Sequence, residues 1–130
     1  MIEEGRALFL QIAEGVEDSI IDGSLVEEAQ APSTNELAAF FRINPATAAK
    51  GVNMLVDKGV LYKRRGIGMF VAPGARELVL AERRTAFADR FVEPLLAEAR
   101  KLGLEADDLS RLILEHAHTH EHDTTEGASR

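Results

Sequence analysis

Apolar residues near the start of the chain recur at the spacing of an amphipathic helix. The aliphatic positions that carry the pattern are four residues apart: Leu8, Ile12, Val16 and Ile20. Acidic residues occupy positions between them, so that one face is apolar and the others are polar. This period predicts a helix over residues 7–22, and Gly23 is suited to end it.

Capping residues predict two further helices. Ser33-Thr34-Asn35-Glu36 fits the capping box, in which the side chains of the first and last residues each accept from the other's backbone N–H. The helix that it starts is expected to end near Phe41. Asn44-Pro45 starts the next helix, because Asn is a favoured N-cap and Pro at the first helical position lacks only an N–H that would be unpaired there. Lys58-Gly59 is expected to close it.

The pattern then changes from helical to β-type. Val60-Leu61-Tyr62 and Met69-Phe70-Val71 flank the segment Arg64-Arg65-Gly66-Ile67-Gly68, which predicts a β-hairpin with a basic, glycine-containing tip. Two capped helices joined by a three-residue turn form a helix-turn-helix, and the hairpin makes it a winged one. The predicted fold class is therefore mainly α with a small β-hairpin wing, followed by a short helical region for dimerisation.

Beyond Pro73-Gly74 the helical period returns over residues 76–102. Pro94 lies inside this segment and should kink or split it near Val92-Glu93, because proline lacks the backbone N–H and clashes with the preceding turn. Residues 107–117 predict one more short helix. We therefore expect a winged helix-turn-helix domain over residues 1–73, a helical dimerisation region over 74–118 and a polar, disordered tail over 119–130.

Composition excludes several classes of protein. The chain has 130 residues, no cysteine and a formal net charge of −7. The lack of cysteine excludes disulfides, thiolate zinc sites and thiol catalysis. No apolar run reaches the roughly 18 to 20 residues of a membrane span, and the N-terminus lacks the charged-then-apolar pattern of a signal peptide. We expect a cytoplasmic protein with no membrane partner.

The acidic balance argues against nucleic acid until the charge is divided along the chain. Residues 42–68 contain six Lys or Arg and one Asp, a local charge of +5 that leaves −12 for the remainder. This basic segment covers the second capped helix and the hairpin. A polyanion responds to the local field of a docking face, so the distribution favours DNA, although a basic solvated surface would give the same count.

In a helix-turn-helix the second helix enters the major groove with its N-terminal residues at the base edges. Ala46 is small enough for close approach, and Asn44, Thr47 and Lys50 offer hydrogen-bonding groups, although Asn44 would cap its helix without DNA. Arg64 on the hairpin tip could reach phosphates or the adjacent minor groove. The predicted DNA-binding residues are Ser33, Thr34, Asn35, Asn44, Ala46, Thr47, Lys50, Lys63, Arg64, Arg65 and Gly66.

Residues 7–71 resemble the winged helix-turn-helix of the GntR family of bacterial transcription regulators. The matching stretches are Leu8-Phe9-Leu10-Gln11-Ile12, Asp22-Gly23-Ser24-Leu25, Pro32-Ser33-Thr34-Asn35-Glu36-Leu37-Ala38, Ile43-Asn44-Pro45-Ala46-Thr47 and Arg65-Gly66-Ile67-Gly68-Met69-Phe70-Val71. The short C-terminal region is similar to that of the YtrA-type subgroup. The resemblance implies a sequence-specific DNA-binding regulator, a dimeric repressor acting on a palindromic operator.

The chain departs from the family pattern at four positions. Asn35 and Pro45 stand where the family often has Arg, and Ala48 stands where it often has Val. These differences imply a different operator, because they fall on base-reading positions. Gly51 stands mid-helix where Ala is usual, which costs roughly 0.5–1 kcal/mol by backbone entropy.

One recognition helix contacts only a few base pairs, so specific binding requires two half-sites about 34 Å apart, and hence a dimer. The candidate dimer interface is an apolar stripe: Leu80, Phe87, Phe91, Leu95, Leu102, Leu109, Leu112 and Ile113. Packing against the first helix of the same chain is the alternative. A small-molecule effector, if there is one, would bind between the C-terminal helices or where they join the winged domain.

All four histidines fall near the C-terminus: His116, His118, His120 and His122. Imidazole binds zinc, copper and nickel, so a metal-binding regulator or carrier is the alternative function. A winged-helix module that binds protein is a third. An enzyme is not expected, because the chain has no histidine outside this run, no nucleophile–base pair and no phosphate loop. No cofactor is expected.

Overall fold

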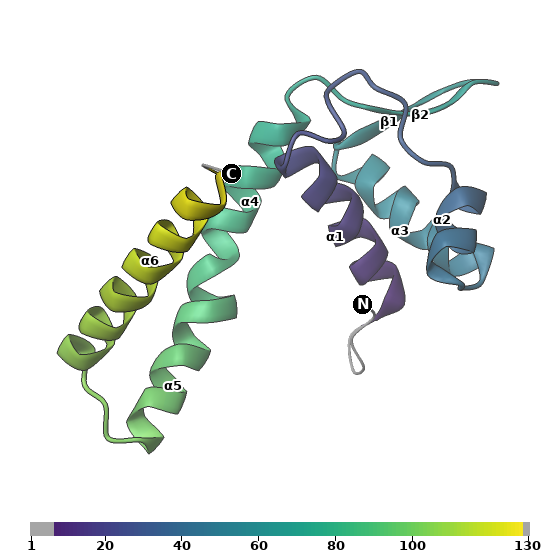
Figure 1. The fold of residues 1–130 in the computed structure, drawn as a ribbon. Helices are drawn as coiled ribbons and strands as arrows, with labels where there is room; N and C mark the ends of the chain where they lie inside the picture. The colour runs from purple at the N-terminus through teal and green to yellow at the C-terminus, as the bar shows by residue number, and fades with distance from the viewer. Residues whose placement is uncertain (1–6, 129–130) are drawn as a thin grey trace. The chain divides into compact units, whose positions relative to one another are not determined.

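The predicted helix-turn-helix and its hairpin are both present in the computed structural model, which describes residues 7–128, and their side chains as far as residue 119. Contacts divide the chain into two compact units, Met1–Arg84 and Thr85–Arg130. The first unit holds α1 (Leu8–Ile21), α2 (Thr34–Phe41), α3 (Pro45–Asp57), β1 (Leu61–Arg64), β2 (Gly68–Val71) and most of α4 (Ala75–Phe87). The second holds the π-helical turn η1 (Ala88–Val92), α5 (Glu93–Lys101) and α6 (Ala106–Ala128) (Figure 1).

The helix starts are those that the capping residues predict. The Ser33 hydroxyl accepts from the Glu36 N–H at 3.0 Å, and Glu36 Oε1 accepts from the Ser33 N–H at 2.9 Å. The backbone N–H of Ser33 holds the pKa of Glu36 below its ordinary value, and the Ser33 side chain adds to this. Asn44 Oδ1 accepts from the Ala46 N–H at 2.8 Å, and Pro45 takes the first helical position. The capping box and the Asn-Pro start are therefore confirmed.

The core of the first unit lies where α1 packs against α3 (Figure 1). Its largest fully buried side chains are Ile12, Ile20, Val52, Leu55, Val60, Val71 and Val79. Gly51 lies at the closest approach of the two helices: a Cβ on it would stand 2.8 Å from the Phe9 carbonyl oxygen. The glycine therefore has a packing reason. Ala48 is also fully buried. It therefore fills the core, and the expectation that it lies at a base-reading position of α3 is wrong.

The hairpin is joined to the rest of the unit by a segment that the sequence pattern did not predict. β1 and β2 are antiparallel, with Leu61 opposite Val71 and Arg64 opposite Gly68. Residues 28–31 run along the other edge of β2. The Ala31 N–H donates to the Met69 carbonyl at 2.8 Å, and Gln30 forms a β-bridge with Phe70. The wing thus has a third, irregular strand at its base.

An ion-pair network attaches α4 to the first unit. Glu17 on α1, only 3% exposed, accepts from Lys58 Nζ at 2.9 Å and from Arg83 at 3.4 Å. Arg83 also pairs with Asp18 at 3.0 Å, and Lys58 with Glu82. The compact unit therefore extends to residue 84, whereas the sequence places the end of the winged domain at residue 73. The functional domain limits stay a prediction.

In the second unit the helix is split just before Pro94, as predicted. The split is a π-type turn, in which the Glu93 N–H donates to the Ala88 carbonyl five residues back. The interrupted ladder accommodates the proline, which has no N–H to give. Gly103, with φ +71°, ends the α5 segment, and α6 runs back beside α5 (Figure 1).

The last helix is longer than predicted. We expected helix over residues 107–117 and a disordered tail over 119–130, but α6 continues to Ala128, and only residues 129 and 130 lie outside the description. The polar composition of residues 119–130 predicts disorder. No proline interrupts the segment, so the helical backbone hydrogen-bond ladder can continue through it. In the described part of the chain, no helix is both long and apolar enough to cross a membrane.

Candidate nucleic-acid interface

The predicted DNA-binding residues fall on three segments of the first unit. Ser33, Thr34 and Asn35 start α2, and Asn44 to Lys50 form the cap and first turns of α3. Lys63 to Gly66 form the hairpin tip. Each of the predicted residues is exposed or half-buried, and none is in the core. In Figure 1 the α2–α3 turn and the hairpin tip both project to the right of the view.

Two of the α3 side chains have contacts that restrict them. Asn44 Oδ1 is occupied by the helix cap, which leaves its amide N–H₂ as the group able to meet a ligand. Lys50 Nζ lies 4.1 Å from the centre of the Phe9 ring. This cation–π contact was missed by sequence reasoning. Phe9 lies off the four-residue apolar stripe of the first helix, and an aromatic outside the stripe was the available signal.

The basic residues of the wing have unequal surroundings. Arg64 Nη2 lies 3.3 Å from Glu28 Oε2 and donates to the Tyr62 hydroxyl at 2.9 Å. Lys63 and Arg65 form no ion pair with any residue that the structure describes. Lys58 belongs to the network with Glu17 and Glu82. Two of the six cations of the basic segment are therefore neutralised within the chain.

The charge network also fixes the protonation of its cations. Burial alone would lower the pKa of Lys58, but hydrogen bonds and ion pairs to Glu82 and Glu17 outweigh it and raise the pKa above its ordinary value. The same balance holds for Arg83, for which pairing with Asp18 and Glu17 exceeds the effect of burial and raises the pKa. Both remain cations in neutral solution. Lys58 holds the C-terminal end of α3 to α1 and α4, and Arg83 holds α4 to α1.

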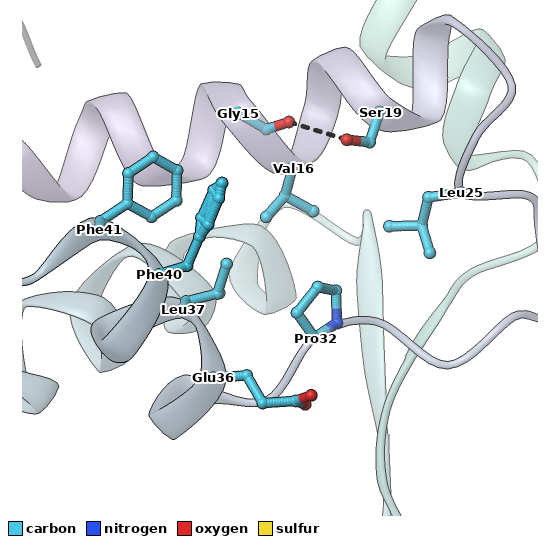
Figure 2. A pocket seen from close by; sticks show the side chains of 9 residues that line it. All are labelled: Gly15, Val16, Ser19, Leu25, Pro32, Glu36, Leu37, Phe40 and Phe41. Atoms are coloured by element: carbon cyan, nitrogen blue, oxygen red, sulfur yellow. Dashed lines mark hydrogen bonds between the residues drawn. The ribbon is translucent and has the colours of Figure 1, made fainter. Parts of the chain in front are cut away.

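The first unit also contains a pocket of about 480 Å³ that the sequence did not predict. Figure 2 shows it between α1 and α2, with the rings of Phe40 and Phe41 between the two helices and Pro32 and Leu25 at the other end. Its walls are mainly apolar, and Glu36 is the one ionisable residue that lines it. It lies on the side of α2 that packs toward α1.

Most of the predicted dimer stripe is exposed in the single chain. Phe91 is 53% exposed, and its ring centre lies 5.4 Å from that of Phe87. Leu95, Leu102, Leu112 and Ile113 are likewise exposed, whereas Leu80 is half-buried. Leu109 is only 7% exposed and is therefore already buried in the single chain. Leu114 is an exposed apolar residue that the stripe omitted.

The histidine run lies on α6. His116 Nδ1 lies 2.9 Å from the Leu112 carbonyl oxygen in the preceding turn, and His118 is exposed. The side chains of His120 and His122 lie outside the described residues. Among the side chains that are described, no three histidine or acidic groups lie close enough to hold a metal ion.

Comparison with known proteins agrees with this geometry. The family described as bacterial regulatory proteins, gntR family, matches residues 8–71. The HTH-type transcriptional repressor YtrA of Bacillus subtilis is 24% identical over 108 residues, covering 83% of this chain and 82% of YtrA. A crystal structure of a GntR-family transcriptional regulator from Bacteroides thetaiotaomicron is 31% identical, with a TM-score of 0.71 over 88% of this chain and 99% of that one.

A further solved structure holds the N-terminal domain of AraR in complex with mutant ORR3. It is 31% identical, with a TM-score of 0.51 over 54% of this chain and all of that one. The family consists of transcription regulators that bind operator DNA, not of enzymes. With the winged helix-turn-helix, the two capped helix starts and the basic wing in place, the chain belongs to the GntR family of bacterial transcription regulators and carries its DNA-binding domain.

Proposed function

We propose that the protein is a dimeric transcription repressor that binds a palindromic operator and blocks the promoter by occupying it. The observation that carries this proposal is a set of cations that form no ion pair with any described residue, together with two exposed, capped helix N-termini in the same unit. These cations are Lys50 on α3 and Lys63 and Arg65 at the wing tip. The similarity to a protein named a transcriptional repressor supports repression and not activation. A protein that binds a chromosomal operator would act in the cytoplasm.

The proposed contacts divide into those that read bases and those that position the protein. Thr47, Lys50 and the Asn44 amide group face the major groove from the first turns of α3, where recognition helices meet base edges. The free backbone N–H groups at the start of α2, around Thr34 and Asn35, bind phosphate. The tip residues Lys63, Arg64, Arg65 and Gly66 lie along the flanking backbone, where they add affinity without reading sequence.

Dimerisation uses the exposed part of the C-terminal stripe. Several large apolar side chains of this stripe are exposed in the single chain, and the aromatic pair Phe87 and Phe91 offers the side-chain type that dominates interface energy. We assign Leu109, which is buried in the single chain, a supporting role in this interface. A two-fold dimer would carry two recognition helices, one for each half-site, which is what a palindromic operator requires.

Selection of bound sequences from a random DNA pool, with the full chain, tests the operator. We expect enrichment of an inverted repeat whose half-sites are about one helical turn apart, roughly 34 Å. The log of affinity should fall linearly with the log of salt concentration, as phosphate contacts release counterions. If the pool yields no enriched sequence, operator recognition is refuted.

Sedimentation equilibrium tests the dimer. The full chain should sediment at about twice the 14.2 kDa of one copy, and the double variant Phe87→Asp, Phe91→Asp should sediment as a monomer. Phe40→Asp is the matched control, because Phe40 is an equally exposed aromatic outside the stripe and its replacement should leave the mass unchanged. A monomeric unmutated chain at micromolar concentration would exclude this interface.

A further inference from the structure

Glu28, in the connector before α2, has an unusual backbone conformation. Its φ is +70°, and among the described residues only Arg42 shares a positive φ without being glycine. Residues with a Cβ adopt this left-handed region at an energetic cost. Glycine at position 28 would avoid that cost, so the glutamate side chain is the feature to be explained. Its backbone is fixed to the sheet, because the Glu28 N–H donates to the Val71 carbonyl at 2.8 Å.

The Glu28 carboxylate binds two side chains of β1, Tyr62 and Arg64. Its Oε2 accepts from the Tyr62 hydroxyl at 2.6 Å and from Arg64 Nη2 at 3.3 Å. Arg64 Nη2 also donates to the Tyr62 hydroxyl at 2.9 Å, which closes a triangle of three groups. The Arg64 guanidinium carbon lies 4.2 Å from the centre of the Phe70 ring, against the strand opposite. The carboxylate, the phenol and the ring together hold this arginine on one face of the hairpin.

The carboxylate occupies the position that a phosphate would take on Arg64. Carboxylates and phosphates bind a guanidinium through the same donors, so DNA must displace Glu28 to use Arg64 fully. The side chains of Glu28 and Arg64 are 49% and 45% exposed, and an ion pair exposed to this extent is weak enough to exchange. The neighbouring tip cations Lys63 and Arg65 have no such competitor in the described part of the chain.

We propose that Glu28 competes with DNA phosphate for Arg64 and thereby weakens binding to DNA of any sequence. Tyr62 positions the Glu28 carboxylate for this competition. The proposal rests on the proposed DNA-binding function and adds to it a residue that lowers sequence-independent affinity. Glu28 does not touch the base contacts proposed for α3, so it should lower operator affinity and non-specific affinity by the same factor.

Salt-dependent binding to a random-sequence duplex measures the competition. Glu28→Gln should tighten binding several-fold and steepen the slope of log affinity against log salt by up to about 0.9, the value of one phosphate contact. Glu27→Gln is the matched control: it removes the same charge one residue away, and the Glu27 side chain accepts from the Gly74 N–H and not from Arg64. An equal effect of the two substitutions would mean that only net charge matters and would overturn the proposal.

Arg64→Gln in both backgrounds completes the test. Because Glu28 already competes for the arginine, the substitution should weaken binding less in the unmutated chain than in the Glu28→Gln variant. Equal losses in the two backgrounds would refute competition. If the unmutated chain binds DNA without salt dependence, the proposed function fails and the competition fails with it, whereas normal binding with no effect of Glu28→Gln refutes the competition alone.

Tyr62 provides a readout that needs no DNA. It is the only tyrosine, and the chain has no tryptophan, so tyrosine fluorescence reports this cluster alone. An excited phenol is a stronger acid and passes its proton to a hydrogen-bonded carboxylate, which quenches its emission. Glu28→Gln should therefore raise the emission while Glu27→Gln leaves it unchanged. Unchanged emission in the Glu28→Gln variant would show that the contact does not form in solution and would overturn the proposal.

Discussion

The same substitution, glycine to alanine, should have opposite effects at two mid-helix positions of this protein. Gly51 on α3 faces the α1 backbone, and a Cβ there would lie 2.8 Å from the Phe9 carbonyl oxygen and 3.3 Å from Ile12 Cβ. Gly15 on α1 faces a side chain, and a Cβ there would lie 3.7 Å from the nearest atom of the Phe41 ring. The first contact is too short for a real Cβ, whereas the second is an ordinary van der Waals distance.

The magnitudes follow from two opposing effects. Alanine gains about 0.5–1 kcal/mol over glycine in a helix interior, because the unfolded chain loses less backbone freedom on folding. At Gly15 this gain is unopposed, so Gly15→Ala should raise the free energy of unfolding by that amount. At Gly51 the clash involves a backbone atom, and overpacking of this kind costs about 1–3 kcal/mol. Gly51→Ala should therefore lower the free energy of unfolding, by up to about 2.5 kcal/mol.

Urea denaturation followed by helical circular dichroism measures both variants against the unmutated chain at one protein concentration, because dimerisation would make the midpoint depend on concentration. The Gly51→Ala midpoint should fall and the Gly15→Ala midpoint should rise, with similar slopes. If Gly51→Ala stabilises the protein as much as Gly15→Ala does, α1 and α3 do not approach as closely as the structure gives, and the packing argument is wrong.

Three other predictions concern charge. Glu17→Gln should lower the free energy of unfolding by about 2 kcal/mol, because it removes the buried carboxylate that pairs with Lys58 and Arg83, whose side chains are about a quarter exposed. Asp18→Asn removes the exposed carboxylate of the network and should lower the free energy of unfolding by less than about 1 kcal/mol. Because folding raises the pKa of Lys58 above 10.5, its contribution is fully present below that pH and should be lost as pH rises through the folded value, which urea titration from pH 9 to 11.5 measures. Lys50→Ala should relax one operator position if Lys50 reads a base, whereas Arg65→Ala should weaken binding uniformly, as selection on a DNA pool would distinguish.

The helix starts could be predicted from sequence because their chemistry is local. A capping box needs only residues three apart, and the Asn44-Pro45 start needs only its own helix, so both appear where the residues place them. The hairpin could be predicted for the same reason, since its two strands are joined by its own tip. The split in the long helix could be predicted from Pro94, because proline has no N–H to donate to the preceding turn and so disturbs the helix next to itself.

Two of the features that were not predicted depend on residues far apart in the chain. The strand-like connector at Gln30 pairs with Phe70 forty residues later, and nothing near Gln30 indicates this. Gly51 looked like an unfavourable helix residue until Phe9 was placed against it. The helical extent of α6 was missed for a different reason: polarity reports the absence of a buried face and does not by itself prevent a helix.

The charge count along the chain predicts a DNA-binding segment over residues 42–68 but overstates the number of cations free to bind DNA. Of the six cations between residues 42 and 68, Lys58 is used to hold helices together and Arg64 is paired with Glu28. Arg42, Lys50, Lys63 and Arg65 remain without an ion pair among the described residues. The DNA binding proposed for this acidic protein therefore rests on these four cations and on two helix N-termini. Because few phosphate contacts give a modest sequence-independent affinity, the base contacts proposed for α3 must supply a larger share of the affinity for an operator.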